Sequence, residues 1–140
     1  MKNFVKVIVA ALFILSVNNN AFAAPTLSLI QKVKNQVEAI RYQLPAQAGY
    51  GLMLTSVSYD SQTYTIVYSY HYNMYVEKPN PEAVKEVKLG LIHMMKANPK
   101  AEDYQFVKGG ITFQYNYYTE SGSLLYTIKI TPADLKWNVV

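Results

Sequence analysis

The two histidines are the first candidates for metal or acid–base chemistry. His71 lies between tyrosines in an alternating segment, and His93 precedes two methionines in a helical segment. A zinc site on one helix needs a second histidine four positions on, but position 97 is alanine. We therefore expect both histidines to be structural, and we expect no metal ion and no cofactor.

Nucleophilic and acid–base catalysis also lack a recognisable arrangement of residues. The chain has no cysteine and no G-x-S-x-G turn, which removes thiolate chemistry and the nucleophile elbow of the hydrolases. The acidic residues fall in turns, helix starts and helix faces, where each has a local structural use. Gly109-Gly110 is not followed by the lysine and hydroxyl of a phosphate-binding loop. The sequence therefore predicts a protein that is not an enzyme.

Tyrosine is the residue type that stands out, with 13 copies in 140 residues. Aromatic side chains pair across strands, so sheet packing is one interpretation. Tyrosine is also enriched at binding surfaces, so a recognition surface is the other. Two helices covering one face of a sheet would leave the other face, or a groove at its edge, for a partner. The candidate partner-binding residues are Leu52, Leu54, Ile66, Tyr68, Leu91 and Met95.

The elements that would position these residues begin with a helix over residues 27–44. Apolar residues recur there at spacings of three and four from Ile30 to Leu44, which is typical of an amphipathic helix. Thr26 can cap its start, and Pro45 ends it because the residue before proline leaves the helical region.

An antiparallel hairpin follows, with strands over residues 49–59 and 63–75. In the second strand the even positions from Tyr64 to Tyr72 point to one face and the odd positions from Thr65 to Asn73 to the other. The run Pro79-Asn80-Pro81-Glu82 then predicts the start of a second helix that continues to about Ala97.

The last third of the mature chain predicts a second hairpin. Residues 104–107 are interpreted as a short strand, residues 111–119 and 124–131 as the hairpin, and residues 131–137 as a short helical turn that packs Leu135 and Trp137 on the domain. The predicted class is α+β in α-β-β-α-β-β order. It contains an antiparallel sheet of four or five strands in two hairpins, packed with two main helices.

The N-terminus reads as an export signal. Two lysines precede an apolar run over residues 7–17 and a polar stretch that ends in a small-x-small site, which predicts cleavage after Ala23, with Ala24 as second choice. Residues 1–23 would then be a signal peptide and residues 24–140 a single periplasmic or secreted domain. Removing Lys2 and Lys6 lowers the net charge from +4 to 13 − 2 − 9 = +2. So small a charge, without a basic cluster, argues against nucleic acid, and no apolar run is long enough for stable membrane insertion.

Two segments carry a resemblance to a known family. Leu44-Pro45 is followed by the strand start at residues 49–54, and the Lys-Gly-Gly-Ile-Thr-Phe run at residues 108–113 is followed by the hairpin at Ser121-Gly122. With its element order over residues 27–135, the chain resembles a group of bacterial type II secretion pilotins. The resemblance implies a periplasmic domain that binds the C-terminal helix of a secretin subunit in an apolar groove.

The chain departs from that family in two respects, both of which concern cysteine. Pilotins are typically lipoproteins anchored through an acylated cysteine and resemble one another in a disulfide, whereas this chain contains no cysteine. The resemblance therefore implies a soluble exported protein that binds a secretin or pilus component of an envelope machine. The alternative from the residues alone is a secreted module that binds a small ligand or glycan through exposed tyrosines.

Overall fold

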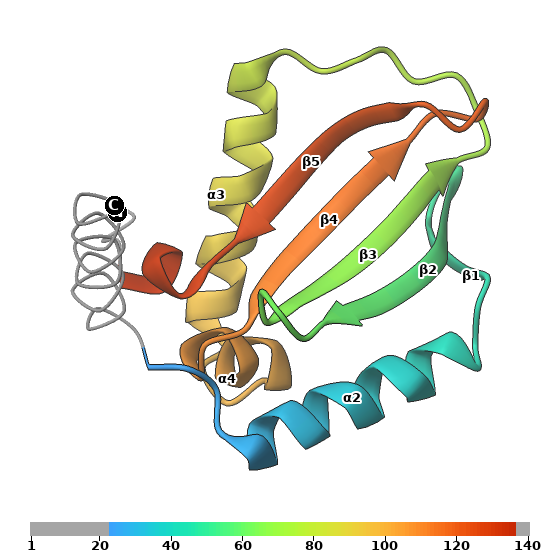
Figure 1. The fold of residues 1–140 in the computed structure, drawn as a ribbon. Helices are drawn as coiled ribbons and strands as arrows, with labels where there is room; N and C mark the ends of the chain where they lie inside the picture. The colour runs from blue at the N-terminus through green and yellow to red at the C-terminus, as the bar shows by residue number, and fades with distance from the viewer. Residues whose placement is uncertain (1–22, 137–140) are drawn as a thin grey trace, which may run out of the picture.

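The computed structural model describes residues 23–136, so residues 1–22 of the predicted signal peptide, and Trp137, lie outside the described part. Within these described residues, three helices and five strands follow one another (Figure 1). The helices are α2 (Leu27–Arg41), α3 (Pro81–Ala97) and α4 (Glu102–Lys108). The strands are β1 (Ala46–Gly49), β2 (Leu52–Asp60), β3 (Thr65–Tyr72), β4 (Thr112–Tyr118) and β5 (Leu124–Ile130), followed by the short 3-10 helix η1 (Pro132–Lys136).

The five strands form one sheet in the order β1-β2-β3-β4-β5. The predicted α+β class and both predicted hairpins are confirmed, but the sheet is mixed, because β3 and β4 are parallel. Parallel neighbours need a crossover, and α3 and α4 supply it by returning the chain to the end of the sheet where β3 began. The sequence pattern determines each hairpin by itself. The direction of one hairpin relative to the other depends on that crossover.

Residues 104–107 belong to helix α4, so the expectation of a short strand there was wrong. Glu102 and Asp103 occupy the first turn of this helix, where acidic side chains are favoured by the helix dipole. Gly109 ends it, and Phe106 and Val107 are buried. The apolar residues here are too few to separate a helix of two turns from a strand by period alone.

The two longer helices begin where their capping residues predict. The Thr26 hydroxyl accepts from the Leu29 amide at 3.1 Å, and the Asn80 side chain accepts from the Ala83 amide at 2.8 Å. Helix α2 ends at Arg41, three residues before the predicted end, and β1 then uses residues 46–49, which were not expected to form a strand of their own.

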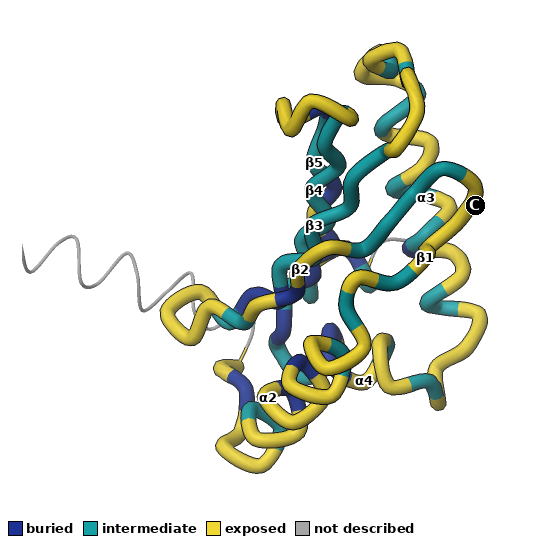
Figure 2. Tube along the Cα trace, turned by 90° about the vertical axis from the view of Figure 1, so that its right-hand side faces the viewer, coloured by how far each residue is buried: buried dark blue, intermediate teal, exposed yellow. Residues whose placement is uncertain are grey.

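The predicted alternation in β3 is confirmed by the strand register. Ile66, Tyr68 and Tyr70 lie beside Phe113, Tyr115 and Tyr117 of β4. Helices α3 and α4 lie on one side of strands β3–β5, and α2 runs below the sheet beside β2 (Figure 2). The core between these layers contains Val33, Val37, Val57, Ile66, Ile92, Phe106, Val107, Ile111, Phe113, Ile128 and Ile130.

The opposite face of the sheet is polar. On it the Asn116 side-chain oxygen accepts from Gln114 at 3.1 Å and from Thr127 at 2.9 Å. The His71 ring stacks on Tyr118 with centroids 4.8 Å apart. No helix among residues 23–136 covers this face in Figure 2. Since hydrogen bonds between neighbouring side chains satisfy its polar groups, we regard it as the solvent-facing side of the sheet.

Candidate partner-binding groove

A hollow of about 220 Å³ lies where α3, α4 and β4 meet. Leu91, Met94 and Met95 of α3 form one wall, and Tyr115 of β4 contributes from the sheet. Asn98, Ala101 and Asp103 close it at the junction of α3 and α4. The lining is therefore largely apolar, with Asn98 and Asp103 as its polar side chains beside the Tyr115 hydroxyl, and Met94 is 69% exposed.

Stacked tyrosines extend from this hollow along the sheet. Tyr68 stacks on Tyr115 with centroids 5.2 Å apart, Tyr70 on Tyr117 at 5.0 Å, and Tyr117 on Tyr126 at 4.5 Å. We call these five residues the tyrosine ladder. All five are half-buried. Because their ring faces lie against one another, the ladder offers ring edges and hydroxyl groups to a partner rather than open ring faces.

The hydroxyl groups of the ladder are held in the neutral form. Burial, with smaller contributions from the neighbouring Tyr70 and Tyr72, raises the pKa of Tyr117 to about 12. Burial also raises the pKa of Tyr68 and Tyr115, and the negative charge of Asp103 adds to the effect. The ladder therefore presents neutral hydrogen-bonding groups at neutral pH.

The six candidate residues predicted from the sequence lie at different depths. Leu52 and Leu54 sit beside Tyr72 and Tyr70 in the sheet, on the ladder's face. Leu91 and Met95 line the hollow, and half-buried Tyr68 stacks on the lining residue Tyr115. Ile66 is 1% exposed and belongs to the core, so it supports the surface from beneath without being accessible itself.

Five residues of the hollow did not appear among the sequence candidates: Met94, Asn98, Ala101, Asp103 and Tyr115. Asp103 falls in the segment whose helix was not recognised, and Met94 competes with Met95 for the buried stripe of α3. A signal for Asp103 was present in the sequence, because two acidic residues just after Pro99 are typical of a helix start.

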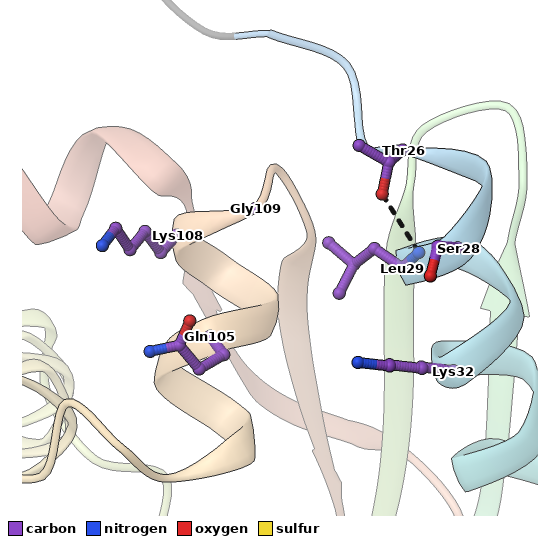
Figure 3. Close-up of a pocket in the computed structure, with 7 residues that line it drawn as sticks. All are labelled: Thr26, Ser28, Leu29, Lys32, Gln105, Lys108 and Gly109. Atoms are coloured by element: carbon purple, nitrogen blue, oxygen red, sulfur yellow. Dashed lines mark hydrogen bonds between the residues drawn. The ribbon is translucent and has the colours of Figure 1, made fainter.

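A second, larger hollow of about 460 Å³ lies between the start of α2 and α4 (Figure 3). Lys32 points from α2 toward α4, whereas Lys108 and Gln105 point away from α2. The Gln105 amide donates instead to the Pro99 carbonyl. The charged groups around this second hollow do not converge on one point, and Leu29 fills the space beside Gly109. We therefore assign no ligand to this hollow.

The geometry of both histidines differs from that of a metal site. His71 stacks on Tyr118, and His93 is exposed on α3. Within residues 23–136 no three His, Asp or Glu side chains gather closely enough to hold a metal ion. None of the helices in this part of the chain combines the length and apolarity required to span a bilayer.

Residues 28–126 match a sequence family described as a domain of unknown function, DUF8479. The chain belongs to this family. The match spans α2 to the first part of β5 and so includes every residue of the hollow. No curated protein sequence matches this member of DUF8479.

The fold of this DUF8479 member is similar to that of solved pilotin structures. The pilotin EpsS of the Vibrio vulnificus type 2 secretion system aligns with a TM-score of 0.57 at 14% identity, over 79% of this chain and 94% of EpsS. The type II secretion pilotin AspS of Vibrio cholerae aligns with a TM-score of 0.54 at 18% identity, over 76% and 92%. A protein from Pseudomonas aeruginosa, described as secreted and not as a pilotin, gives 0.52 at 6% identity, over 78% and 94%. The resemblance to pilotins is thus confirmed for the fold.

Proposed function

We propose that this DUF8479 protein is a pilotin-like accessory that binds a secretin or pilus subunit of a bacterial envelope machine. Two solved structures with this fold are type II secretion pilotins. At these identities the likeness concerns the fold, so the argument for a shared role has to come from the surface of this chain.

The observation that carries the proposal is the open, apolar hollow beside the tyrosine ladder. Met94 is 69% exposed on a surface otherwise lined by half-buried Leu91, Met95 and Tyr115. Exposed methionine next to apolar walls is common where a protein accepts the apolar side of a helix, because its side chain adapts to different partners. A C-terminal helix of a secretin subunit is the partner we propose.

The proposed site of action is the periplasm or the cell exterior. Export through the predicted signal peptide would leave a chain that starts at Ala24. Pro25 is buried in the structure, close to the backbone of Gly110. The first residues after the proposed cleavage site are therefore part of the folded domain.

Binding of a small ligand or glycan through exposed tyrosines is less well supported. A sugar ring usually stacks on a free aromatic face, but the faces of the tyrosine ladder are occupied by neighbouring rings at 4.5–5.2 Å. The arrangement favours a partner that contacts ring edges and apolar side chains.

The test is a titration of the exported protein with synthetic C-terminal peptides of the secretin subunits of the same organism. We expect a dissociation constant in the micromolar range and at least a tenfold loss for Met94→Asp, about 1.4 kcal/mol. Leu27→Asp is the matched control, because Leu27 is 86% exposed on α2 and does not line the hollow. Equal affinities of both variants, or no binding of any secretin peptide, would refute the proposed function.

A further inference from the structure

Asp103 is the charged side chain in the lining of the α3–α4–β4 hollow. It lies in the first turn of α4, at the exposed rim, with Leu91, Met95 and Tyr115 among the other residues that form the walls. The apolar surroundings provide no counter-charge. The first turn of α4 favours an acidic side chain, but none of the other residues that line the hollow is a cation that could pair with it.

Within residues 23–136 the Asp103 carboxylate forms no side-chain hydrogen bond and no ion pair. The two ion pairs of this part of the chain are Glu38 with Arg41 and Lys88 with Asp134. Loss of hydration raises the pKa of Asp103 above its ordinary value. Its negative charge also adds to the effect of burial in raising the pKa of Tyr70. The folded chain therefore holds a negative charge beside the tyrosine ladder that forms no ion pair within residues 23–136.

The charge and the apolar walls together define the chemistry of a complementary partner. A lysine or arginine side chain can lay its methylene groups along Leu91 and Met95 while its cationic end reaches Asp103. Such a pair would give Asp103 the cationic partner that it does not have among residues 23–136.

We propose that the hollow receives an amphipathic segment of a partner protein that inserts one lysine or arginine against Asp103, with apolar side chains flanking it against Leu91, Met94 and Tyr115. This inference rests on the proposed function in that the partner is a protein. Beyond the proposed function, it specifies that the inserted residue is positively charged and that the Asp103 carboxylate receives it. In this arrangement the apolar contacts supply most of the buried contact area. The ion pair with Asp103 fixes the position of the bound segment in the hollow and selects partners that carry a basic residue there.

The test uses a probe that is independent of any secretin. A phage-displayed library of random 16-residue peptides is selected against the full exported protein and, in parallel, against Asp103→Asn. Glu120→Gln is the matched control, since it removes one negative charge from an exposed turn outside the hollow. Binders that compete for the hollow are recognised because Met94→Asp abolishes them.

We expect peptides selected on the wild type and on Glu120→Gln to share one lysine or arginine among apolar residues, and this preference to vanish on Asp103→Asn. For the best peptide, changing that basic residue to glutamine should weaken binding to the wild type about tenfold and to Asp103→Asn less than twofold. A thermal melt of Asp103→Asn no lower than that of the wild type excludes misfolding as the cause.

Neutral or acidic peptides at the hollow, an unchanged basic preference on Asp103→Asn, or the absence of any competing binder would each overturn the inference. Selection of basic amphipathic peptides together with failure of every secretin peptide would refute the proposed function alone, and the chemistry of the hollow would stand.

Discussion

The sheet face that the helices cover has two ends. Side chains alternate in the same way at both ends, but they are buried to different extents. Near the starts of β3 and β4, Ile66 and Phe113 are each 1% exposed, and Ile130 beside them is fully buried. Toward the ends of the same strands, Tyr70, Tyr117 and Tyr126 are only half-buried. Helices α2 and α4 contribute Val33, Val37, Phe106 and Val107 to the first end, whereas the second end carries the ladder.

The same alternation of side chains along the strands therefore serves two purposes, one at each end of the sheet face. Aliphatic residues and phenylalanine fill the closed end, where every atom is removed from water. Tyrosine occupies the open end, where one edge of the ring packs and the hydroxyl remains near solvent. We interpret the closed end as the part that stabilises the fold and the open end as the part available to a partner.

The largest expected difference between the two ends is in stability. Phe113→Ala should lower the free energy of unfolding by about 3–5 kcal/mol, because it leaves a cavity among buried side chains. Tyr117→Ala, at the corresponding position of the open end, should cost about 1–2 kcal/mol. Urea denaturation measures both, and equal losses would contradict the division.

Alkaline pH should affect the open end next. The raised pKa of Tyr117, about 12, means that the folded state binds this proton more tightly than the unfolded chain does. The stabilisation is complete below the ordinary tyrosine pKa of about 10 and is lost as the pH rises toward 12. Unfolding followed from pH 8 to 12 should show this decline, and Tyr117→Phe should reduce its slope. If the free energy of unfolding of Tyr117→Phe declined with pH as steeply as that of the wild type, the decline would come from other titrating groups.

A smaller effect is expected at the hydroxyl pair of the open end. The Tyr72 and Tyr126 hydroxyls are 3.3 Å apart and form a half-buried hydrogen bond. Tyr72→Phe should lower the free energy of unfolding by about 0.5–1 kcal/mol. Tyr75→Phe serves as the control in thermal denaturation, because Tyr75 is 79% exposed. A loss as large as that of Phe113→Ala would place Tyr72 in the core instead.

The smallest effect, with the opposite sign, is expected for Asp103. Its pKa is raised by loss of hydration, so ionisation lowers the stability of the folded state, and that loss is relieved as the pH falls through the raised pKa. Asp103→Asn should therefore leave stability at pH 7 unchanged or raise it by up to about 0.5 kcal/mol. It should also flatten the stability profile at pH values just above the ordinary aspartate pKa of about 4. A clear loss of stability would mean that Asp103 has a structural role.

The strands of both hairpins were predictable because their information is local. In β3 the parity of Ile66, Tyr68 and Tyr70 is set by the period of the extended chain, and a slip by one residue would exchange buried and exposed side chains. The helix starts at Thr26 and Asn80 were predictable for the same reason, since capping depends on neighbours three residues away.

The candidate groove was predictable in part. The sequence identified Leu91 and Met95 as residues of one helical stripe and Tyr68 as a residue of one strand face. The sequence also placed Ile66 among the candidate partner-binding residues. Alternation along a strand shows which face a residue lies on, but it does not show how much of that face a helix covers. Asp103 depended on the packing of α4 against α3 and β4, which brings residues far apart in sequence into one hollow.

The sequence by itself determined the α+β class, the two hairpins, the capped helices and the alternation of the tyrosine-rich strand, because these depend on backbone periods and near neighbours. Only the tertiary structure decided that β3 and β4 are parallel, that residues 102–108 form a helix, and that Asp103 lies beside the tyrosine ladder with no ion-pair partner among residues 23–136. Those features arise from how the crossover α3–α4 packs on the sheet, and packing between distant segments leaves no periodic trace in the chain.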